Sequence, residues 1–427
     1  MRFLLITKEY PPIPDASGTI VYHLCSELKK KGHHVDVIAR SHKAHVNRGT
    51  SGDVFWVQIS FWEKLSKKVG SGNCRRSDLM LYRLLTYVRK FLLMFRIHKF
   101  PDSECNVTRR TVRTYKKYLK HQKYDCVIGF FRPYSCLSAA MQVAKENRTA
   151  TSIACYFDLV DAKTRPSLMP KVLYEKLIQK GDRKVMERCN YIMLPVSAHK
   201  KENLELNQFP NAIYYEFPTF MVREQRDGYI DPSEDRELRL VFAGTMDRAY
   251  RNPESMLQVI HRTAEAMPDR KVRLDVFGGG DCAQLFQSGQ WSRNLSIVYH
   301  GRVPKEEVVA YEAQAHFLIN VMNAYEAIVP SKIFELFASG KPILNFVTHS
   351  DDGSLEYFKK YPLCCTIDWP HASEKERTQL VASVHAFMLQ NQGRRVDIQT
   401  ITSLFQKCTP EYVAEQIIYA CQKGENG

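Results

Sequence analysis

The chain has 427 residues, which is too long for one ordinary hydrophobic core, so about two domains are expected. Apolar residues make up 44% and charged residues 25%, as in a soluble globular protein, and no uncharged stretch reaches about 18 residues, which excludes a membrane-spanning helix. The net charge of +15 is uneven: residues 1–215 hold 38 Lys and Arg against 18 Asp and Glu, and residues 216–427 hold 23 against 28. The first half is therefore expected to meet an anionic lipid, nucleic acid or phosphorylated substrate, and the alternative is a solvated basic surface.

The 12 cysteines show no C-x-x-C spacing, so no metal or redox motif is predicted from them. Scattered thiols in a chain of this size suit a reducing cytoplasm. The apolar run Phe3–Ile6 is too short for a signal peptide. A cytoplasmic location is expected.

The first elements in chain order alternate between strand and helix. "RFLLIT" predicts a buried strand, and residues Ile20, Val21, Leu24 and Leu28 then recur at helical spacing until Gly32. "HHVDVIA" predicts the next strand, so the chain opens as a βαβ unit with a parallel sheet. Similar apolar runs at "YDCVIGF", "TSIACYF" and "YIMLPVS" extend this α/β domain over residues 1–215.

The segment from Asp78 to Pro101 fits neither sheet. At 100° per residue, four cations share one side of a helix: Arg83, Arg89, Lys90 and Arg96. The apolar residues of the other side are Leu84, Val88, Phe91, Leu92 and Phe95. This basic amphipathic helix is predicted to lie on an anionic membrane surface, and the alternative is a helix packed on the sheet with a solvated basic face.

A polar, turn-rich linker is predicted at residues 216–236, followed by a second α/β domain at 237–408. Its strands are predicted at "LRLVFAG", "KVRLDVFGGG", "LSIVYHG", "HFLINVM" and "KPILNF". Residues 409–427 predict a final amphipathic helix.

The stretch "LDVFGGGDCA" resembles a dinucleotide-binding loop, because Gly278, Gly280 and Ala283 match G-x-G-x-x-A after a strand. Three features argue against that function. Asp281 stands where a pyrophosphate would approach, no acidic residue follows about 20 positions on, and the loop does not follow the first strand of its series.

The stretch "VPSKIFELFASGKPIL", residues 329–344, predicts a short helix that Ser331 caps and Gly340 ends. Lys332 and Glu335 lie three residues apart and therefore on one face. Free N–H groups at a helix start attract anions, so Lys332 is suited to a phosphate, and Glu335 could accept hydrogen bonds from sugar hydroxyls. The residues alone leave a surface Lys–Glu pair equally open.

Over essentially its whole length, the chain resembles the GT-B glycosyltransferases of sequence family 4. The nucleotide-sugar signature of that family, "PSK-x-FE" followed by "GKP", is matched by "VPSKIFELFASGKPILNF". Weaker matches occur in the expected order at "MRFLLITKEYPPIPDASGTIVYHL", "LRLVFAGTMDRAYRNPESML" and "IVYHGRVPKEEVVAYEAQAHFLINV". The resemblance implies an α/β chain of two Rossmann-like domains facing a central cleft, with the last helix crossing back to the first domain.

The resemblance also implies roles for individual residues. Lys332 would hold the donor diphosphate, Glu335 the ribose, and Arg248 or Arg251 would supply a second cation. The remaining implied donor-binding residues are Gly18, Gly244, Arg302, Val303, Asn323 and Ser331, while Lys332, Arg251 and Asp158 are the implied catalytic residues.

The chain departs from the family pattern at the donor sugar. Family members often carry two Glu with seven residues between them, whereas Glu326 and Glu335 are separated by eight. Glu326 is thus an uncertain equivalent of the first of these acids, and Asn320 and Asn323 are alternatives for contact with the sugar.

The expected function is transfer of a sugar from a nucleotide-diphosphate sugar to a glycan or lipid-linked acceptor, with retention of configuration and without a metal or other cofactor. Polysaccharide biosynthesis is the expected setting, with the protein peripheral on the inner face of the plasma membrane and no nucleic-acid partner. A nucleotide-sugar epimerase of the same fold and a non-catalytic membrane-associated scaffold are the alternatives.

Overall fold

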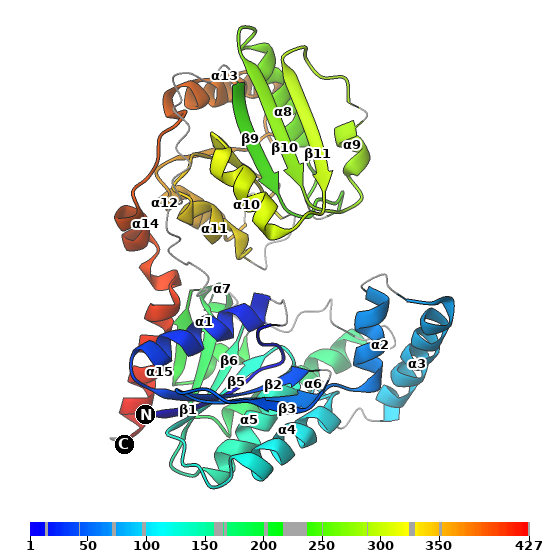
Figure 1. Cartoon of the computed structure of the whole chain (residues 1–427), viewed down its shortest axis with the longest axis vertical. Helices are drawn as coiled ribbons and strands as arrows, with labels where there is room; N and C mark the ends of the chain where they lie inside the picture. Colours follow the sequence, from blue (N-terminus) through cyan, green and yellow to red (C-terminus); the bar gives the residue numbers. More distant parts are fainter. Residues whose placement is uncertain are drawn as a thin grey trace. The chain divides into compact units, whose positions relative to one another are not determined.

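The computed structural model describes residues 1–12, 16–41, 43–70, 74–95, 100–157, 165, 169–199, 204–216, 237–249, 251–287, 289–323, 329–349 and 352–425. The chain divides into two compact units. Unit 1 comprises Met1–Pro218 and Lys407–Gly427, and unit 2 comprises Thr219–Gln406. Each unit is a sheet with helices packed against it (Figure 1). The predicted α/β class with two Rossmann-like domains is confirmed.

Within its described residues, unit 1 contains an eight-stranded sheet in the order β3-β4-β2-β1-β5-β6-β7-β8, parallel except for the β3–β4 pair. The strands are β1 (Arg2–Ile6), β2 (His34–Ser41), β3 (His45–Asn47), β4 (Val54–Gln58), β5 (Cys126–Phe131), β6 (Thr151–Tyr156), β7 (Tyr191–Pro195) and β8 (Ala212–Tyr215). Every residue of β5 and β6 is buried, as expected of central parallel strands covered on both faces.

The helices of unit 1 are α1 (Ala16–Lys30), α2 (Phe61–Gly70), α3 (Arg76–Phe95), α4 (Cys105–Tyr118), α5 (Tyr134–Glu146), α6 (Lys171–Met186), α7 (Val196–His199) and α15 (Pro410–Glu425), with short 3₁₀ turns at Glu205–Gln208 and Gln406–Cys408. Helix α15 starts with proline, which is favoured at the first helical position. Its apolar side chains Val413, Ile417 and Cys421 join the core of unit 1. Lys31, just after α1, pairs with Glu415 at 2.7 Å, so the end of the chain is fastened to its first helix.

The described part of unit 2 contains a six-stranded parallel sheet in the order β11-β10-β9-β12-β13-β14. Its strands are β9 (Glu237–Ala243), β10 (Lys271–Phe277), β11 (Leu295–Gly301), β12 (Phe317–Val321), β13 (Ile343–Phe346) and β14 (Cys364–Ile367). Its helices are α8 (Glu254–Glu265), α9 (Ala283–Gln287), α10 (Lys305–Gln314), α11 (Lys332–Ala338), α12 (Leu355–Lys360), α13 (Glu374–Asn391) and α14 (Ile398–Leu404).

Both sheets reverse their strand order once. Counted along the chain, the strands of unit 2 lie in the order third, second, first, fourth, fifth, sixth. Once β3 is set aside, unit 1 follows the same order and adds β8 as a seventh strand. The reversal lies between β1 and β5 in unit 1 and between β9 and β12 in unit 2. Ligands of doubly wound sheets bind outside the carboxyl ends of the strands at this reversal, so it locates the candidate site.

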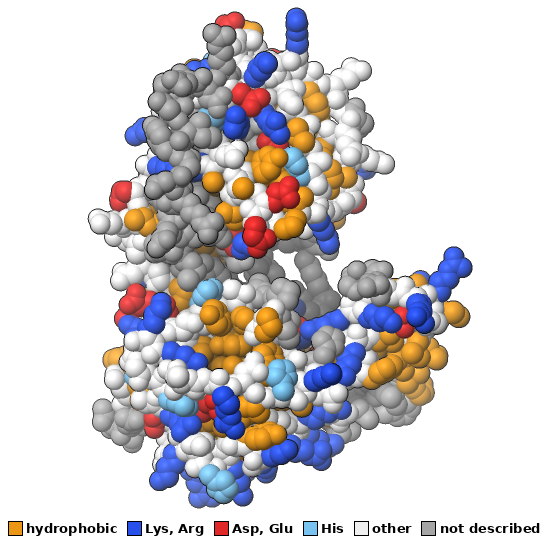
Figure 2. All heavy atoms as spheres, in the orientation of Figure 1, with side chains coloured by type: hydrophobic (Ala, Val, Ile, Leu, Met, Phe, Trp, Pro, Cys, Tyr) orange, Lys and Arg blue, Asp and Glu red, His pale blue; other side chains and the backbone are white. Residues whose placement is uncertain are grey.

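Helix α3 packs against α2, and one apolar face of α3 is exposed. Trp62 of α2 stacks on Tyr82 and donates a hydrogen bond from Nε1 to Thr86 Oγ1 at 3.3 Å. The exposed apolar side chains of α3 are Met80, Leu81, Leu84, Tyr87, Val88 and Phe91, and Figure 2 shows hydrophobic side chains gathered there with Lys and Arg beside them. The helix begins two residues before the predicted start and includes Leu84, Val88 and Phe91 of the predicted apolar side.

The cation Arg83 on α3 is also exposed. The side chains of Arg89, Lys90, Leu92 and Phe95, and the whole of Arg96, lie outside the described residues. Among the helices that the structure describes, none is both long and apolar enough to cross a membrane.

Candidate functional site

The loops that follow β9, β10 and β11 are joined by hydrogen bonds at the carboxyl edge of unit 2. Gly244 N–H donates to Phe277 O at 2.9 Å, Met246 N–H to Gly279 O at 2.9 Å, and Gly278 N–H to Gly301 O at 2.7 Å. This pairing requires glycine at position 278, where φ is +132° and a Cβ would lie 1.8 Å from Gly244 O. The edge next to the strand-order reversal is therefore a connected backbone platform.

Gly278 and Gly280, which follow β10, let this loop pack directly on the backbone of the loop after β9. The Asp281 carboxylate accepts a hydrogen bond from Arg248 N–H at 3.0 Å and so fixes the neighbouring loop. The loop follows β10, the second strand of unit 2. This agrees with the sequence analysis, which argued against a dinucleotide site because the loop does not follow the first strand. These glycines allow close packing of backbone on backbone.

Arg251 occupies the reversal between β9 and β12. Its Nη2 donates to Asn323 Oδ1 at 2.8 Å, and Asn323 lies two residues beyond the end of β12. Gly244 leaves room for the guanidinium, because a Cβ there would lie 3.1 Å from Arg251 Nη1. The two loops that flank the reversal therefore meet through Arg251.

The Arg251 guanidinium is half-buried and incompletely paired. Its Nε is buried and has no hydrogen-bond partner in the described part of the chain, and no described carboxylate lies within ion-pair distance. Burial lowers the pKa of Arg251, while the negative charges of Asp247 and Asp352 oppose that shift. An arginine stays charged at neutral pH, so this position favours an anion.

Of the two asparagines suggested for the donor sugar, Asn323 lies at the site and Asn320 does not. Asn320 is buried within β12, and its Nδ2 donates to Asn345 Oδ1 of β13 at 2.8 Å. Asn323 is partly exposed, and its carbonyl oxygen accepts from Thr348 Oγ1 at 2.8 Å. Asn320 is thus committed to a buried pair, and its suggested contact with a sugar is not supported.

Helix α11 begins at Lys332, but its first residues differ from the expectation. Ser331 directly precedes the helix as predicted, but it has helical backbone angles, φ −58° and ψ −27°, and makes no side-chain capping bond. The turn instead starts at Pro330, whose carbonyl oxygen accepts Ile333 N–H at 3.2 Å. A serine in helical geometry cannot place its hydroxyl on the following N–H groups as a capping serine does.

Lys332 and Glu335 each bind a residue of α10. Lys332 Nζ lies 3.3 Å from Glu312 Oε1, and Lys305 Nζ lies 3.1 Å from Glu335 Oε1. The Glu312 side chain is 14% exposed, whereas Lys305 is 65% exposed. The Lys332–Glu312 pair is thus the more shielded of the two. Sequence spacing could not reveal either partner, because both contacts join separate helices.

The other predicted donor residues of unit 2 are more open. The side chains of Arg248 and Arg302 are exposed, and Val303 is partly buried. The Arg302 guanidinium lies over Gly279, where a Cβ would approach its Nε to 2.6 Å. Arg302 therefore closes over the loop after β10, beside the platform.

Gly18 lies inside α1, where its missing Cβ has a local reason. A Cβ at Gly18 would approach Glu9 O to 2.8 Å, so glycine allows α1 to pack on the loop after β1. The predicted residues Asp158 and Glu326 lie outside the described part of the chain.

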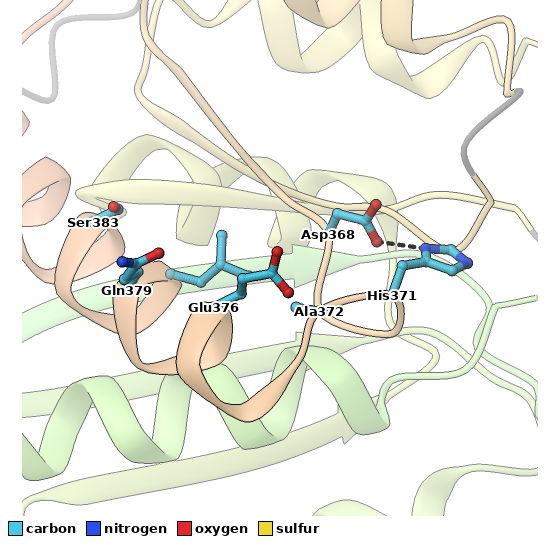
Figure 3. Close-up of a pocket in the computed structure, with 7 residues that line it drawn as sticks. Asp368, His371, Ala372, Glu376, Gln379 and Ser383 are labelled. Carbon is cyan, nitrogen blue, oxygen red and sulfur yellow. Dashed lines mark hydrogen bonds and ion pairs between the residues drawn. The ribbon is translucent and has the colours of Figure 1, made fainter.

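A separate pocket of about 410 Å³ opens after β14, an edge strand of the unit 2 sheet. Figure 3 shows Asp368 and His371 facing each other, with Glu376 and Gln379 contributed by α13. His371 Nδ1 lies 2.6 Å from Asp368 Oδ1. Strand β13 separates β14 from the reversal, so this pocket is distinct from the Arg251 site. Nowhere in the described residues do three or more His, Cys, Asp or Glu side chains gather as a metal site would need.

No protein-family model matches this chain, and no curated protein matches it. Its structure is similar to that of the lipopolysaccharide outer core galactosyltransferase WaaB in its apo form, with 11% identity, 99% of each chain covered and a TM-score of 0.55. The catalytic domain of starch synthase IV from Arabidopsis thaliana, bound to ADP and acarbose, has 10% identity and a TM-score of 0.56. That match covers 100% of this chain and 99% of the other.

Anabaena HepE in complex with UDP-glucose is a third similar structure, with 9% identity, a TM-score of 0.53, and 99% of this chain and 100% of the other covered. These proteins share the GT-B fold, and their likeness extends over both units of this chain. Together with the strand order of the two sheets, the comparisons establish the GT-B fold for this chain.

Proposed function

We propose that this protein is a glycosyltransferase of the hexosyltransferase class, which moves a sugar from a nucleotide-diphosphate sugar to a glycan or lipid-linked acceptor with retention of configuration. One observation carries the proposal: a half-buried, incompletely paired guanidinium, that of Arg251, stands at the strand-order reversal of unit 2. A diphosphate would supply the anion that this position favours. The UDP-glucose and ADP held by similar structures support a nucleotide donor.

In the proposed reaction, negative charge develops on the diphosphate as the bond to the sugar breaks. Arg251 and Lys332 would stabilise that charge with fixed positive charges, which lowers the barrier more than it stabilises the bound donor. Glu335 would accept hydrogen bonds from the ribose hydroxyls. The step needs no enzymic nucleophile if the acceptor attacks the same face that the diphosphate leaves.

The deciding experiment is a panel of nucleotide sugars, tested first for thermal stabilisation and then for transfer. A donor at 100 times its dissociation constant adds about 2.7 kcal/mol, which corresponds to roughly 3 °C in Tm for a chain of 427 residues. The Arg251→Gln variant should lose most of this stabilisation, with Arg262→Gln on α8, where Arg262 pairs with Glu374, as the control. Conversion of the donor sugar without transfer would indicate an epimerase, and absence of binding to any nucleotide sugar would refute the proposal.

Unit 1 is proposed to bind the acceptor at an anionic membrane. Helix α3 exposes a continuous apolar face, in which Leu84 is 60% and Phe91 56% exposed. Helix α4 contains no acidic residue, and its exposed cations are Arg109, Arg110, Arg113, Lys116 and Lys117. An exposed apolar helix face in a unit that also carries a basic helix suits the boundary between acyl chains and anionic head groups, where each cation contributes about 1 kcal/mol.

Vesicle sedimentation tests this membrane contact. The double variant Leu84→Gln/Phe91→Gln should release the protein from vesicles that contain phosphatidylserine, whereas Leu389→Gln, at a 50% exposed position of α13, should not. Vesicles of phosphatidylcholine alone should bind the parent weakly. If the parent instead forms a dimer that the double variant abolishes, the α3 face is a contact between copies and the membrane proposal fails.

A further inference from the structure

Asp352 is a buried carboxylate with only one of its two oxygens bonded. Asp352 lies in the loop after β13, and the residue is only 4% exposed. Oδ1 accepts hydrogen bonds from Ser354 N–H and Ser354 Oγ, both at 2.7 Å. Oδ2 is buried and finds no hydrogen-bond partner in the described residues. Since buried acceptors are nearly always bonded, this free oxygen needs an explanation.

The fold places Asp352 near the candidate donor site. Thr348, at the start of the same loop, donates to the carbonyl oxygens of Met322 and Asn323 at 3.0 and 2.8 Å. That contact joins the loop after β13 to the end of β12, where Asn323 holds Arg251. Burial raises the pKa of Asp352 and lowers the pKa of Arg251, and the charge of each group opposes that shift at the other. The two side chains therefore share one electrostatic environment.

The chemistry of the free oxygen limits what it can bind. A carboxylate oxygen accepts a donor and repels an anion, so Oδ2 does not hold the phosphate that Arg251 attracts. The positive charge of Arg251 disfavours a second cation nearby. A hydroxyl group on a molecule attached to that phosphate satisfies both conditions.

We propose that Asp352 Oδ2 accepts a hydrogen bond from a hydroxyl of the sugar that is transferred, so that Asp352 determines donor-sugar specificity. This inference rests on the proposed glycosyltransferase function and extends it. It assigns the sugar contact to the loop after β13, whereas the sequence pattern looked for an acidic residue before α11. No covalent role is assigned to Asp352.

The Asp352→Asn variant tests the roles of the two carboxylate oxygens separately. The amide oxygen of asparagine can keep both bonds to Ser354, while its NH₂ group replaces the free oxygen with a donor. Affinity is measured for UDP-glucose and UDP, and for ADP-glucose and ADP, and the pair that binds the parent is used. We expect the variant to bind the nucleotide sugar about 10- to 100-fold more weakly and the free nucleoside diphosphate within about twofold of the parent.

Two comparisons complete the test. Asp397→Asn is the matched control, because Asp397 accepts from Thr400 N–H and Oγ in a similar turn on the surface of the same unit. Deoxy-sugar donors should locate the contact: one of them should bind the parent weakly, yet bind Asp352→Asn no worse than the complete donor does.

An equal loss for the nucleotide sugar and the free nucleoside diphosphate would overturn the inference, and so would an unchanged affinity for both. A parent that binds UDP or ADP but discriminates no sugar would also overturn it. A parent that binds neither nucleotides nor nucleotide sugars would refute the proposed function itself, which is a different outcome.

Discussion

Removal of Lys332 should weaken both the donor complex and the empty protein, and a second substitution should separate the two effects. In Lys332→Ala, the largely buried Glu312 carboxylate loses the ammonium 3.3 Å away. A hydrogen bond between charged groups contributes about 1.5–3 kcal/mol, but Lys332 is a third exposed and solvent weakens the pair. A cation at a helix start is also unfavourable by about 0.3–1 kcal/mol.

These terms leave a net destabilisation of about 0.5–2 kcal/mol for the Lys332→Ala variant, or roughly 0.5–2 °C in Tm for a chain of 427 residues. If Lys332 had no partner at the helix start, its removal would be expected to cause no loss of stability. Donor affinity should fall roughly 10- to 150-fold, because one charged contact with the diphosphate is lost.

The double variant Lys332→Ala/Glu312→Gln removes the unpaired carboxylate. It should recover most of the lost stability while donor affinity stays low. Tm is measured without ligand, and donor affinity by calorimetry. If the double variant regains donor binding, Lys332 acts only by neutralising Glu312, and the reasoning about a direct diphosphate contact is wrong. If Lys332→Ala keeps both the Tm and the donor affinity of the parent, the residue has neither role.

Three further predictions concern Glu335, the metal requirement and stereochemistry of transfer, and Asp182. Glu335→Ala should reduce kcat/KM about 10-fold or more, and most of that loss should vanish for a donor analogue without ribose hydroxyls. Transfer should survive EDTA and keep the configuration of the donor, so an inverted product or a requirement for Mn²⁺ would contradict this. Burial raises the pKa of Asp182 to about 7, so the folded state keeps a proton that the unfolded chain has lost between about pH 4 and 7. Chemical denaturation should show that the free energy of unfolding of the parent falls as pH rises through that window, by up to about 1.4 kcal/mol per pH unit. The Asp182→Asn variant should not show this fall.

The central strands of both sheets were predictable because they are apolar runs. "YDCVIGF" and "TSIACYF" correspond to β5 and β6, in which every residue is buried. Four strands were missed: β3, β4, β8 and β14. They lie at or next to the sheet edges and, apart from β4, are three or four residues long, so neither length nor continuous burial separates them from loops.

The candidate site was predictable in part for a different reason. Its position followed from the resemblance and from the rule that ligands bind at the strand-order reversal, where Arg251 and Asn323 meet. The partners of Lys332 and Glu335 were not predictable, since Glu312 and Lys305 lie on another helix. The free oxygen of Asp352 has no sequence signal either, because burial and missing partners exist only in the folded chain.

The polar contacts of α10 explain why the charges of α11 are held in place before any ligand binds. Helix α10 has no buried side chain, so apolar packing alone does not fix it. Lys341 Nζ instead donates to the carbonyl oxygens of Ala313 and Ala315 at the end of α10, and Glu312 binds Lys332. A lysine ammonium has three N–H groups, so Lys332 can keep Glu312 while it donates to a phosphate. A charge that is already oriented loses less freedom when the donor arrives, and this is the physical advantage of holding Lys332 with the partly shielded carboxylate of Glu312.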